Sequence, residues 1–106
     1  MGYTRNMFDV ITTDEFKAWA AGLRDRMAVT RIAARLDNAA NGNLGDWHTL
    51  RNGVSEMRVN VGAGYRLYFT RRELTIIILL CGGDKSTQDA DIARAIKLAK
   101  AWGAES

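Results

Sequence analysis

The sequence contains no proline, a single cysteine and a single histidine. The lone cysteine, Cys81, excludes an internal disulfide and is expected to pack as a small hydrophobic side chain. One histidine without a cysteine cluster argues against a zinc site, and we predict neither a metal nor a cofactor. The chain also lacks internal repeats and low-complexity segments. With 106 residues, it is expected to fold as one domain spanning residues 1–106.

Long apolar segments are also missing. The longest uninterrupted apolar run, from Ile76 to Cys81, is far too short to span a membrane and is typical of a buried strand. The first seven residues contain no apolar stretch of the signal-peptide type, so a cytoplasmic protein is expected. A composition that is 47% hydrophobic and 25% charged is typical of a globular domain and not of a disordered chain.

The excess of positive charge is moderate, with a net charge of +3 at neutral pH. The basic side chains are eleven arginines and four lysines. Arginine binds phosphate with two hydrogen bonds and stacks on bases, so this preference favours an anionic partner such as nucleic acid. A charge of +3 is also common on surfaces without such a partner, and the composition alone leaves both interpretations open.

The first half of the chain predicts one strand and two helices. The strand is expected from Thr4 to about Thr12. Thr12 and Glu15 have the spacing of a capping box that would start the first helix, and Gly22 is expected to end it. A second helix is predicted from Asp25 to Ala40, which gives an antiparallel helical hairpin. Its apolar stripe is expected to be Val29, Ile32, Ala33, Leu36 and Ala40, with Arg24, Arg31 and Arg35 elsewhere on the surface.

The second half predicts an antiparallel β-meander and a C-terminal helix. Apolar and polar residues alternate from Val54 to Val61 and from Tyr65 to Thr70, with Gly62-Ala63-Gly64 as the turn between them. The apolar run from Leu74 to Cys81 is expected to be a central strand covered on both faces. The predicted fold class is therefore α+β.

The register of this hairpin gathers polar residues on one face. If Val61 pairs with Tyr65, Asn60 lies opposite Arg66 and Arg58 lies opposite Tyr68. One open face of the sheet would then carry Glu56, Arg58, Asn60, Arg66 and Tyr68. Such a face could bind a phosphate, or it could be the solvated outer face of an ordinary antiparallel sheet.

Two further parts of the sequence are candidates for anion binding or proton transfer. The segment from Gly82 to Thr87 lacks the glycine spacing of an ATP-binding P-loop. A glycine-rich turn with Lys85 before a helix can still bind an anion, or it can be an ordinary tight turn. His48 is an acid or base candidate near neutral pH, or an exposed loop histidine.

From Gly45 onward the sequence resembles a known toxin family. The resemblance is carried by Glu56-Met57-Arg58, Gly64-Tyr65-Arg66-Leu67-Tyr68 and Gly83-Asp84-Lys85-Ser86-Thr87-Gln88. These segments are similar to the phage-derived HigB branch of the RelE/ParE superfamily, often called addiction module killer proteins. The resemblance covers nearly the whole chain. It implies a RelE-like fold with an N-terminal strand, a helical hairpin, an antiparallel meander and a C-terminal helix.

The resemblance implies the toxin of a type II toxin–antitoxin system, a metal-independent and ribosome-dependent mRNA endonuclease that inhibits translation. In this chemistry the ribose 2′-hydroxyl attacks the adjacent phosphate. A base takes the hydroxyl proton, cations stabilise the developing charge and an acid protonates the leaving oxygen. The implied partners are a cognate antitoxin, usually a helix-turn-helix protein, and the ribosome with its mRNA.

The resemblance also implies roles for single residues. Arg58 and Arg66 match the family's basic residues on the sheet and are expected to stabilise the phosphate and the transition state. Lys85 matches the basic position after the last strand and is expected to serve the leaving group or bind phosphate. His48 is the first candidate base and Glu56 the second. RNA contacts are expected from Arg58, Asn60, Arg66, Tyr68 and Lys85.

Two departures from the family leave the activity open. RelE has a lysine near the position of Asn60 and a tyrosine toward the C-terminal end, and this chain has neither. Two alternatives therefore remain. One is a ParE-like poison of DNA gyrase that acts by binding, and the other is a decayed toxin that retains only antitoxin binding.

Overall fold

The computed structural model describes residues 7–104. The elements in chain order are β1 (Asp9–Thr12), α1 (Asp14–Ala21), α2 (Arg26–Ala40), β2 (Trp47–Thr49), β3 (Val54–Val59), β4 (Tyr65–Arg72), β5 (Ile76–Asp84), a 3-10 turn (Lys85–Thr87) and α3 (Gln88–Ala104). This order confirms the predicted α+β class and adds β2, which was not predicted. The part of the first strand expected at residues 4–6 lies outside the described residues.

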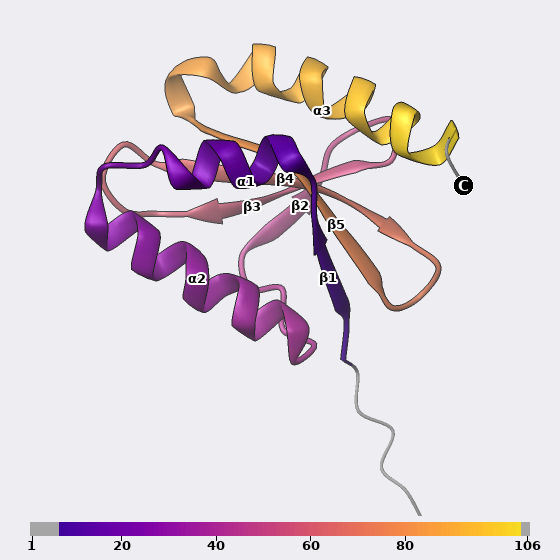
Figure 1. Ribbon diagram of the computed structural model, residues 1–106, viewed down its shortest axis with the longest axis horizontal. Helices are drawn as coiled ribbons and strands as arrows, with labels where there is room; N and C mark the ends of the chain where they lie inside the picture. Colours follow the sequence, from indigo (N-terminus) through magenta and orange to yellow (C-terminus); the bar gives the residue numbers. More distant parts are fainter. Residues whose placement is uncertain (1–6, 105–106) are drawn as a thin grey trace, which may run out of the picture.

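The five strands form one mixed sheet in the order β1-β5-β4-β3-β2 (Figure 1). The pairs from β2 to β5 are antiparallel, whereas β1 runs parallel to β5, with Asp9 opposite Ile76. Residues 77–81 of β5 are fully buried between the two helical layers. The prediction of a central strand covered on both faces is therefore confirmed for this part of the run, whereas Leu74, the predicted first residue, precedes β5 and is 84% exposed.

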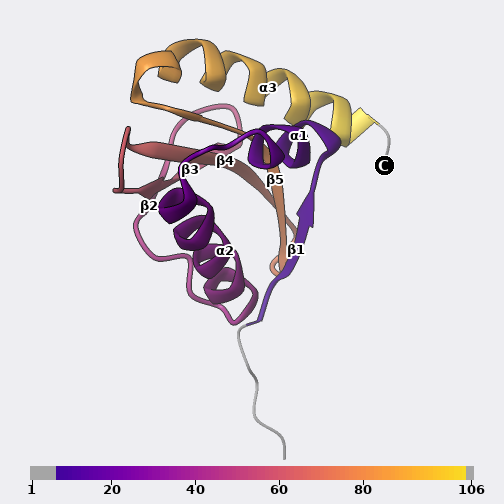
Figure 2. The same cartoon turned by 60° about the vertical axis from the view of Figure 1, so that its left-hand side comes forward.

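Helices cover both faces of the sheet. Helices α1 and α2 lie on one face and α3 lies on the other (Figure 2). The core between the sheet and α1/α2 includes Phe16, Ile32, Met57, Leu67 and Phe69. The core beneath α3 includes Val54, Tyr68, Ile78, Ile92 and Ala95. The three inner strands β3, β4 and β5 thus alternate their side chains between two buried layers. No membrane-spanning helix is found within residues 7–104.

Helix α1 begins one residue later than predicted. Thr13 is the N-cap: its hydroxyl accepts a hydrogen bond from the Phe16 amide at 3.0 Å and donates one to the Leu80 carbonyl at 2.7 Å. Thr12 belongs to β1, so the predicted capping box of Thr12 and Glu15 is wrong. Glu15 binds a side chain of α3 instead. Gly22 ends the helix as predicted.

Helix α2 has the predicted length, with Asp25 as its N-cap. The predicted apolar stripe is confirmed at Ile32 and Leu36, which pack on the core, and is wrong at Val29 and Ala33, which are exposed. Ala28, Ile32 and Ala39 are buried, whereas Val29 is 44% exposed. The buried face continues through Arg35, which reaches the sheet and was predicted to lie on the surface. The chain reverses between α1 and α2, but the main packing partner of both helices is the sheet and not the other helix.

The register between β3 and β4 differs from the prediction by two residues. Val59 pairs with Tyr65, which places Arg58 opposite Arg66. The turn is five residues long, from Asn60 to Gly64, and uses positive φ angles of 55° at Gly62 and 79° at Gly64. A two-residue shift leaves every strand side chain on its predicted face, although its partner changes. Asn60 leaves the sheet and lies exposed in the turn.

Gly82 and Gly83 lie inside β5, so the prediction of a glycine-rich turn from Gly82 to Thr87 is wrong for both glycines. A Cβ on Gly82 would lie 2.3 Å from the Trp19 ring of α1. A Cβ on Gly83 would lie 1.8 Å from Oδ2 of Asp91 in α3. Because glycine has no side chain, α1 and α3 can approach β5 closely at these two positions, from opposite faces of the sheet.

Candidate functional site

The face that was predicted to be open lies largely beneath α3. Glu56 is 1% exposed and Arg66 is 9% exposed. The expectation of an open, solvent-filled face is therefore wrong for these residues. Arg58 is different, because its side chain remains 42% exposed.

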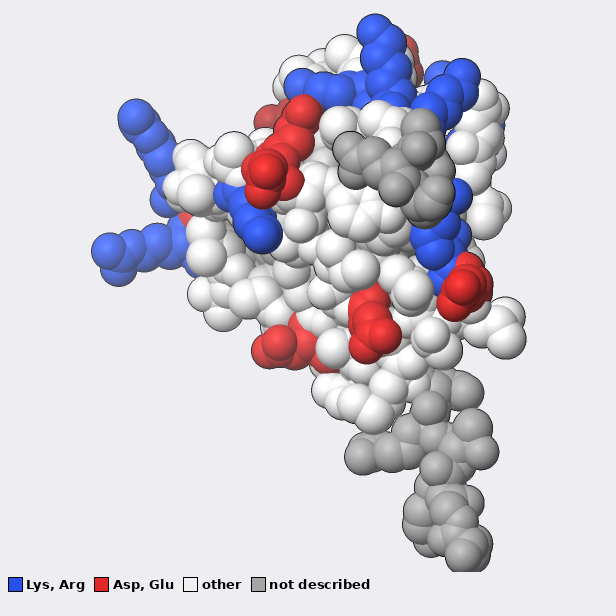
Figure 3. Space-filling model, turned by 45° about the vertical axis from the view of Figure 1, so that its right-hand side comes forward, with Lys and Arg blue, Asp and Glu red and all other residues white. Residues whose placement is uncertain are grey.

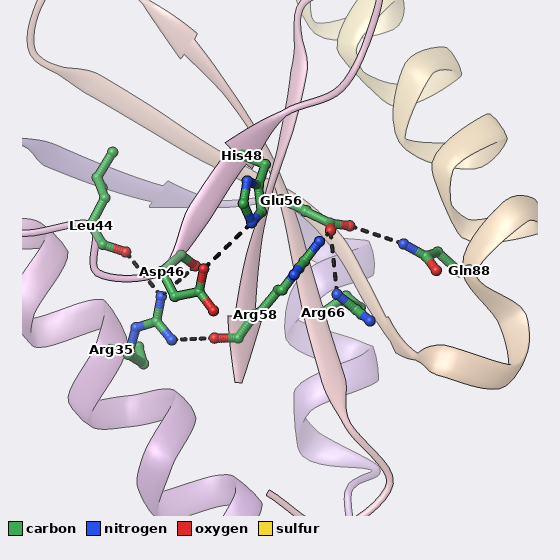
Figure 4. A network of polar contacts seen from close by, with 8 residues as sticks. All are labelled: Arg35, Leu44, Asp46, His48, Glu56, Arg58, Arg66 and Gln88. Atoms are coloured by element: carbon green, nitrogen blue, oxygen red, sulfur yellow. Dashed lines mark hydrogen bonds and ion pairs between the residues drawn. The ribbon is translucent and has the colours of Figure 1, made fainter. Parts of the chain in front are cut away.

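Glu56 is the centre of a buried polar cluster. Its Oε1 accepts hydrogen bonds from Nε of Arg58 and Nη1 of Arg66, both at 3.3 Å. Its Oε2 accepts one from Nε2 of Gln88 at 3.2 Å (Figure 4). Glu56 and Arg58 come from β3, Arg66 from β4 and Gln88 from the start of α3. We call these four residues the Glu56 cluster; its two guanidinium groups compensate the buried carboxylate.

His48 lies beside this cluster. It is directly opposite Glu56 in the pairing of β2 with β3, and its side chain is 49% exposed. Its Nε2 is 3.5 Å from Oδ1 of Asp46. Directly opposed residues of an antiparallel pair point to the same face of the sheet, so the imidazole and the Glu56 side chain share one face (Figure 4). The structure thus brings together four of the predicted site residues: His48, Glu56, Arg58 and Arg66.

Arg35 of α2 fixes the segment that leads into β2. Its guanidinium donates hydrogen bonds to the carbonyls of Arg58, Leu44 (2.9 Å) and Asp46 (3.0 Å). Burial lowers the pKa of Arg35 below its ordinary value, and the nearby Asp46 carboxylate acts in the opposite direction. Gly45 has a φ of 67° and would bring a Cβ within 2.9 Å of this guanidinium.

Sequence reasoning missed Arg35 and Gln88 as members of this region. An arginine in a helix is usually a surface residue, which is why Arg35 was assigned to the surface. Its spacing from Ala28, Ile32 and Ala39 places it on their face of the helix and was the available signal. Gln88 ends one of the three segments that carry the family resemblance, but nothing in the sequence linked its amide to Glu56.

Lys85 and Asn60 stand apart from the Glu56 cluster. Lys85 is exposed just after β5, and its aliphatic stem packs over Gly64, where a Cβ would lie 3.2 Å from Cε. Gln88, which contacts Glu56, follows in the same short segment. Lys85 and the cluster therefore share one end of β5, although no direct contact joins them in the described part of the chain.

Tyr68 was predicted to contact RNA, and this prediction is wrong. The residue is fully buried beneath α3, and its hydroxyl has no hydrogen-bond partner within residues 7–104. Burial raises the pKa of the phenol, and the nearby carboxylates of Glu56 and Asp91 raise it further. The sequence placed Tyr68 on the correct face but could not show that α3 covers it.

The exposed part of the site can bind an anion. Nε of Arg58 is engaged with Glu56, and the side chain remains 42% exposed, so its guanidinium can still be reached from the solvent. A phosphate there would lie near two guanidinium groups and an imidazole, the groups that phosphoryl chemistry uses for charge and proton transfer.

On another side of the molecule, near β1 and the end of α3, acidic and basic side chains surround a largely uncharged centre (Figure 3).

Comparison with known proteins finds a similar protein of a bacterium. Over 92 residues the chain is 42% identical to an uncharacterized protein of Haemophilus influenzae, and the match covers 87% of this chain and 93% of that protein. No protein-family model matches the chain.

Proposed function

The chain belongs to the same family as the Haemophilus influenzae protein, and we propose that it is the RelE-like toxin of a type II toxin–antitoxin system, of the HigB type, that cleaves mRNA on the ribosome. The observation that carries this proposal is the pairing of Arg58 with Arg66 on one carboxylate oxygen beside an exposed histidine. The order of the elements also supports the proposal, because the resemblance implies a strand, two helices, a meander and a last helix.

Arg58 and Arg66 are assigned to the scissile phosphate. Their charge opposes the negative charge that develops when the phosphate becomes pentacoordinate. Glu56 was the second candidate base, but both its oxygens are occupied and it is 1% exposed. We therefore assign Glu56 to positioning the two guanidinium groups, with Gln88 holding its second oxygen.

His48 is assigned as the base. The imidazole takes the proton of the 2′-hydroxyl, the 2′-oxygen bonds to phosphorus, and the bond to the 5′-oxygen breaks. The products are a 2′,3′-cyclic phosphate and a 5′-hydroxyl. The leaving oxygen needs a proton, and Lys85, exposed at the same end of β5, is the candidate acid. Asp46, 3.5 Å from the ring, orients the histidine.

The partners in this proposal are the translating ribosome with its mRNA in the cytoplasm and a cognate antitoxin, expected to be a small helix-turn-helix protein. An antitoxin would suppress cleavage by covering His48 and Arg58 or by displacing the strands that carry them. Asn60, exposed in the β3–β4 turn, remains a candidate RNA contact.

The test is primer extension on a defined mRNA in a translating lysate, with and without the protein. Cuts at ribosome-occupied codons are expected with the unmodified protein. His48→Gln is expected to slow cleavage by about 10²–10⁴-fold and Arg58→Gln by about 10²–10³-fold. Both side chains are half-exposed, so these variants should fold normally; Arg66 is less suitable because it is buried against Glu56.

The matched control is Arg31→Gln, which removes an equal charge from an exposed position of α2 and should cleave like the unmodified protein. Intact mRNA in the presence of folded, unmodified protein would contradict the proposal. DNA breakage on expression would then favour gyrase poisoning, and the absence of any growth effect would favour a toxin that only binds its antitoxin.

A further inference from the structure

A pocket with both apolar and basic side chains lies on the other side of β2 from His48. It has a volume of about 310 Å³, and its lining includes Trp47, Arg51, Ser55 and Arg71. Among residues 7–104, no acidic residue lines it. The pocket therefore offers positive charge, hydroxyl groups and an aromatic ring, and it lies outside the cluster around Glu56.

The two arginines of this pocket are available to an anion. Within the described part of the chain, neither Arg51 nor Arg71 forms an ion pair with a carboxylate. The guanidinium carbon of Arg71 lies 5.2 Å from the centre of the Phe8 ring and 6.0 Å from that of Trp47. Contacts of this kind hold the cation in place without neutralising it.

The edge strand β2 joins this pocket to the Glu56 cluster. Trp47 and His48 are consecutive residues, so their side chains point to opposite faces of the sheet. Trp47 packs against Phe69 in the core below α1 and α2, whereas His48 lies opposite Glu56 on the α3 side. Because β2 is the last strand of the sheet, a chain molecule that passes over this edge can reach both faces.

We propose that this pocket binds a nucleotide of single-stranded RNA next to the cleaved one, with Arg51 and Arg71 on phosphate and Trp47 against a base. The inference rests on the proposed ribonuclease function, whose substrate would cross β2 between the two sites. Trp47 is partly buried but lines the pocket, and arginine beside an accessible aromatic ring is the combination that binds single strands without regard to sequence. An acidic peptide would use the arginines but not the ring, which is why RNA is favoured.

The test measures the binding of an RNA oligonucleotide with 2′-O-methyl groups at every position, which cannot be cleaved by 2′-hydroxyl attack. Fluorescence anisotropy gives the affinity over a range of salt concentrations. Arg51→Gln and Arg71→Gln are each expected to weaken binding and to reduce the slope of log K against log salt by about 0.7, the value for one phosphate contact on a single strand. Arg31→Gln is the matched control and should match the unmodified protein.

Tryptophan emission supplies a second measurement. RNA should quench part of the emission of the unmodified protein, and Trp47→Phe should abolish this quenching, since Trp19 and Trp102 lie elsewhere. Equal weakening by all three arginine variants would mean general attraction and would overturn the inference. Failure of the unmodified protein to bind RNA, or preferential binding of polyglutamate, would also overturn it.

These outcomes are separable from those of the cleavage test, because the oligonucleotide cannot react and no ribosome is present. Normal mRNA cleavage with unchanged RNA affinity in both pocket variants would overturn the pocket assignment alone. Loss of mRNA cleavage by the unmodified protein would overturn the proposed function while RNA binding in the pocket was still measured directly.

Discussion

At the scale of single residues, the buried hydroxyl of Tyr68 has no hydrogen-bond partner in the described part of the chain, so removing it tests the packing beneath α3. We expect Tyr68→Phe to leave stability unchanged or to raise it by about 1 kcal/mol, because no hydrogen bond is lost and a desolvated oxygen is removed. Urea unfolding monitored by circular dichroism measures this. mRNA cleavage should persist as well. A loss of more than about 1 kcal/mol would show that the oxygen has a partner, such as a buried water.

Neutralising Glu56 is expected to lower the free energy of unfolding strongly. In Glu56→Gln, Arg66 keeps its charge but loses its carboxylate partner, and its side chain is only 11% exposed. We expect a loss of about 3 kcal/mol of unfolding free energy, nearly all from Arg66, because removing one member of a buried pair leaves the other uncompensated. Arg58 contributes little, since it is 42% exposed and screened by water.

Chemical denaturation gives the free energy, and Glu73→Gln is the matched control in an exposed turn. That control should change stability by less than about 0.5 kcal/mol. A Glu56→Gln protein as stable as the control would mean that the carboxylate does not organise the cluster, and the positioning role assigned to it would be lost.

The sequence identified which residues share the site better than it identified their surroundings. The alternation of β3 and β4 placed Glu56, Arg58 and Arg66 on one face, and this holds because side-chain direction is local to each strand. Whether a polar face is open depends on helices distant in sequence. The burial of Tyr68 under α3 and the contact of Gln88 with Glu56 are therefore beyond the reach of local pattern.

At the scale of elements, Gly82 sets how closely α1 approaches β5. A methyl group at Gly82 would lie 2.3 Å from the Trp19 ring, which is part of the packed core. We expect Gly82→Ala to cost about 1–3 kcal/mol, since the ring must move within a close-packed layer. Thermal and urea unfolding would detect this loss.

Gly22→Ala is the matched control for this substitution. Its φ is −85°, and the nearest atoms to an added Cβ are 3.6 Å away, which is ordinary contact. That variant should be neutral or stabilised by about 0.5 kcal/mol, because alanine reduces the freedom of the unfolded chain. Equal effects at Gly82 and Gly22 would contradict the close packing of Trp19 on β5.

Element boundaries were predicted where caps and apolar periodicity agree, as in α2 with Asp25 at its start. The boundaries were missed where contacts with distant parts of the chain determine how far an element extends. Gly82 and Gly83 look like a turn in sequence, yet they extend β5 because Trp19 and Asp91 occupy the space beside them. The β3–β4 register was missed for a similar reason, since a turn of three or five residues preserves the same faces.

At the scale of the whole molecule, two layers of helices enclose the sheet, and the α3 layer buries two weak acids. Burial raises the pKa of the Cys81 thiol to about 11. It also raises the pKa of the Tyr68 phenol. Both groups are fully buried, so the folded protein holds these protons more tightly than the unfolded chain does.

This difference predicts a protein that loses stability in alkali. The unfolded chain releases the thiol proton near pH 9, whereas the folded chain keeps it to about pH 11. Above pH 9 the unfolded state therefore binds fewer protons, and stability falls as the pH rises. Across this window the loss from Cys81 is about 3 kcal/mol, and Tyr68 extends the fall above pH 10.

Urea midpoints measured from pH 7 to 10.5 would show this decline. Cys81→Ala should flatten it between pH 9 and 10, and Tyr68→Phe should flatten the part above pH 10, because each variant lacks the proton in question. Lysine titration is common to all three proteins and cancels in the comparison. If Cys81→Ala declined as steeply as the unmodified protein, the thiol would have to reach water in the folded state, and α3 would not seal this face of the sheet.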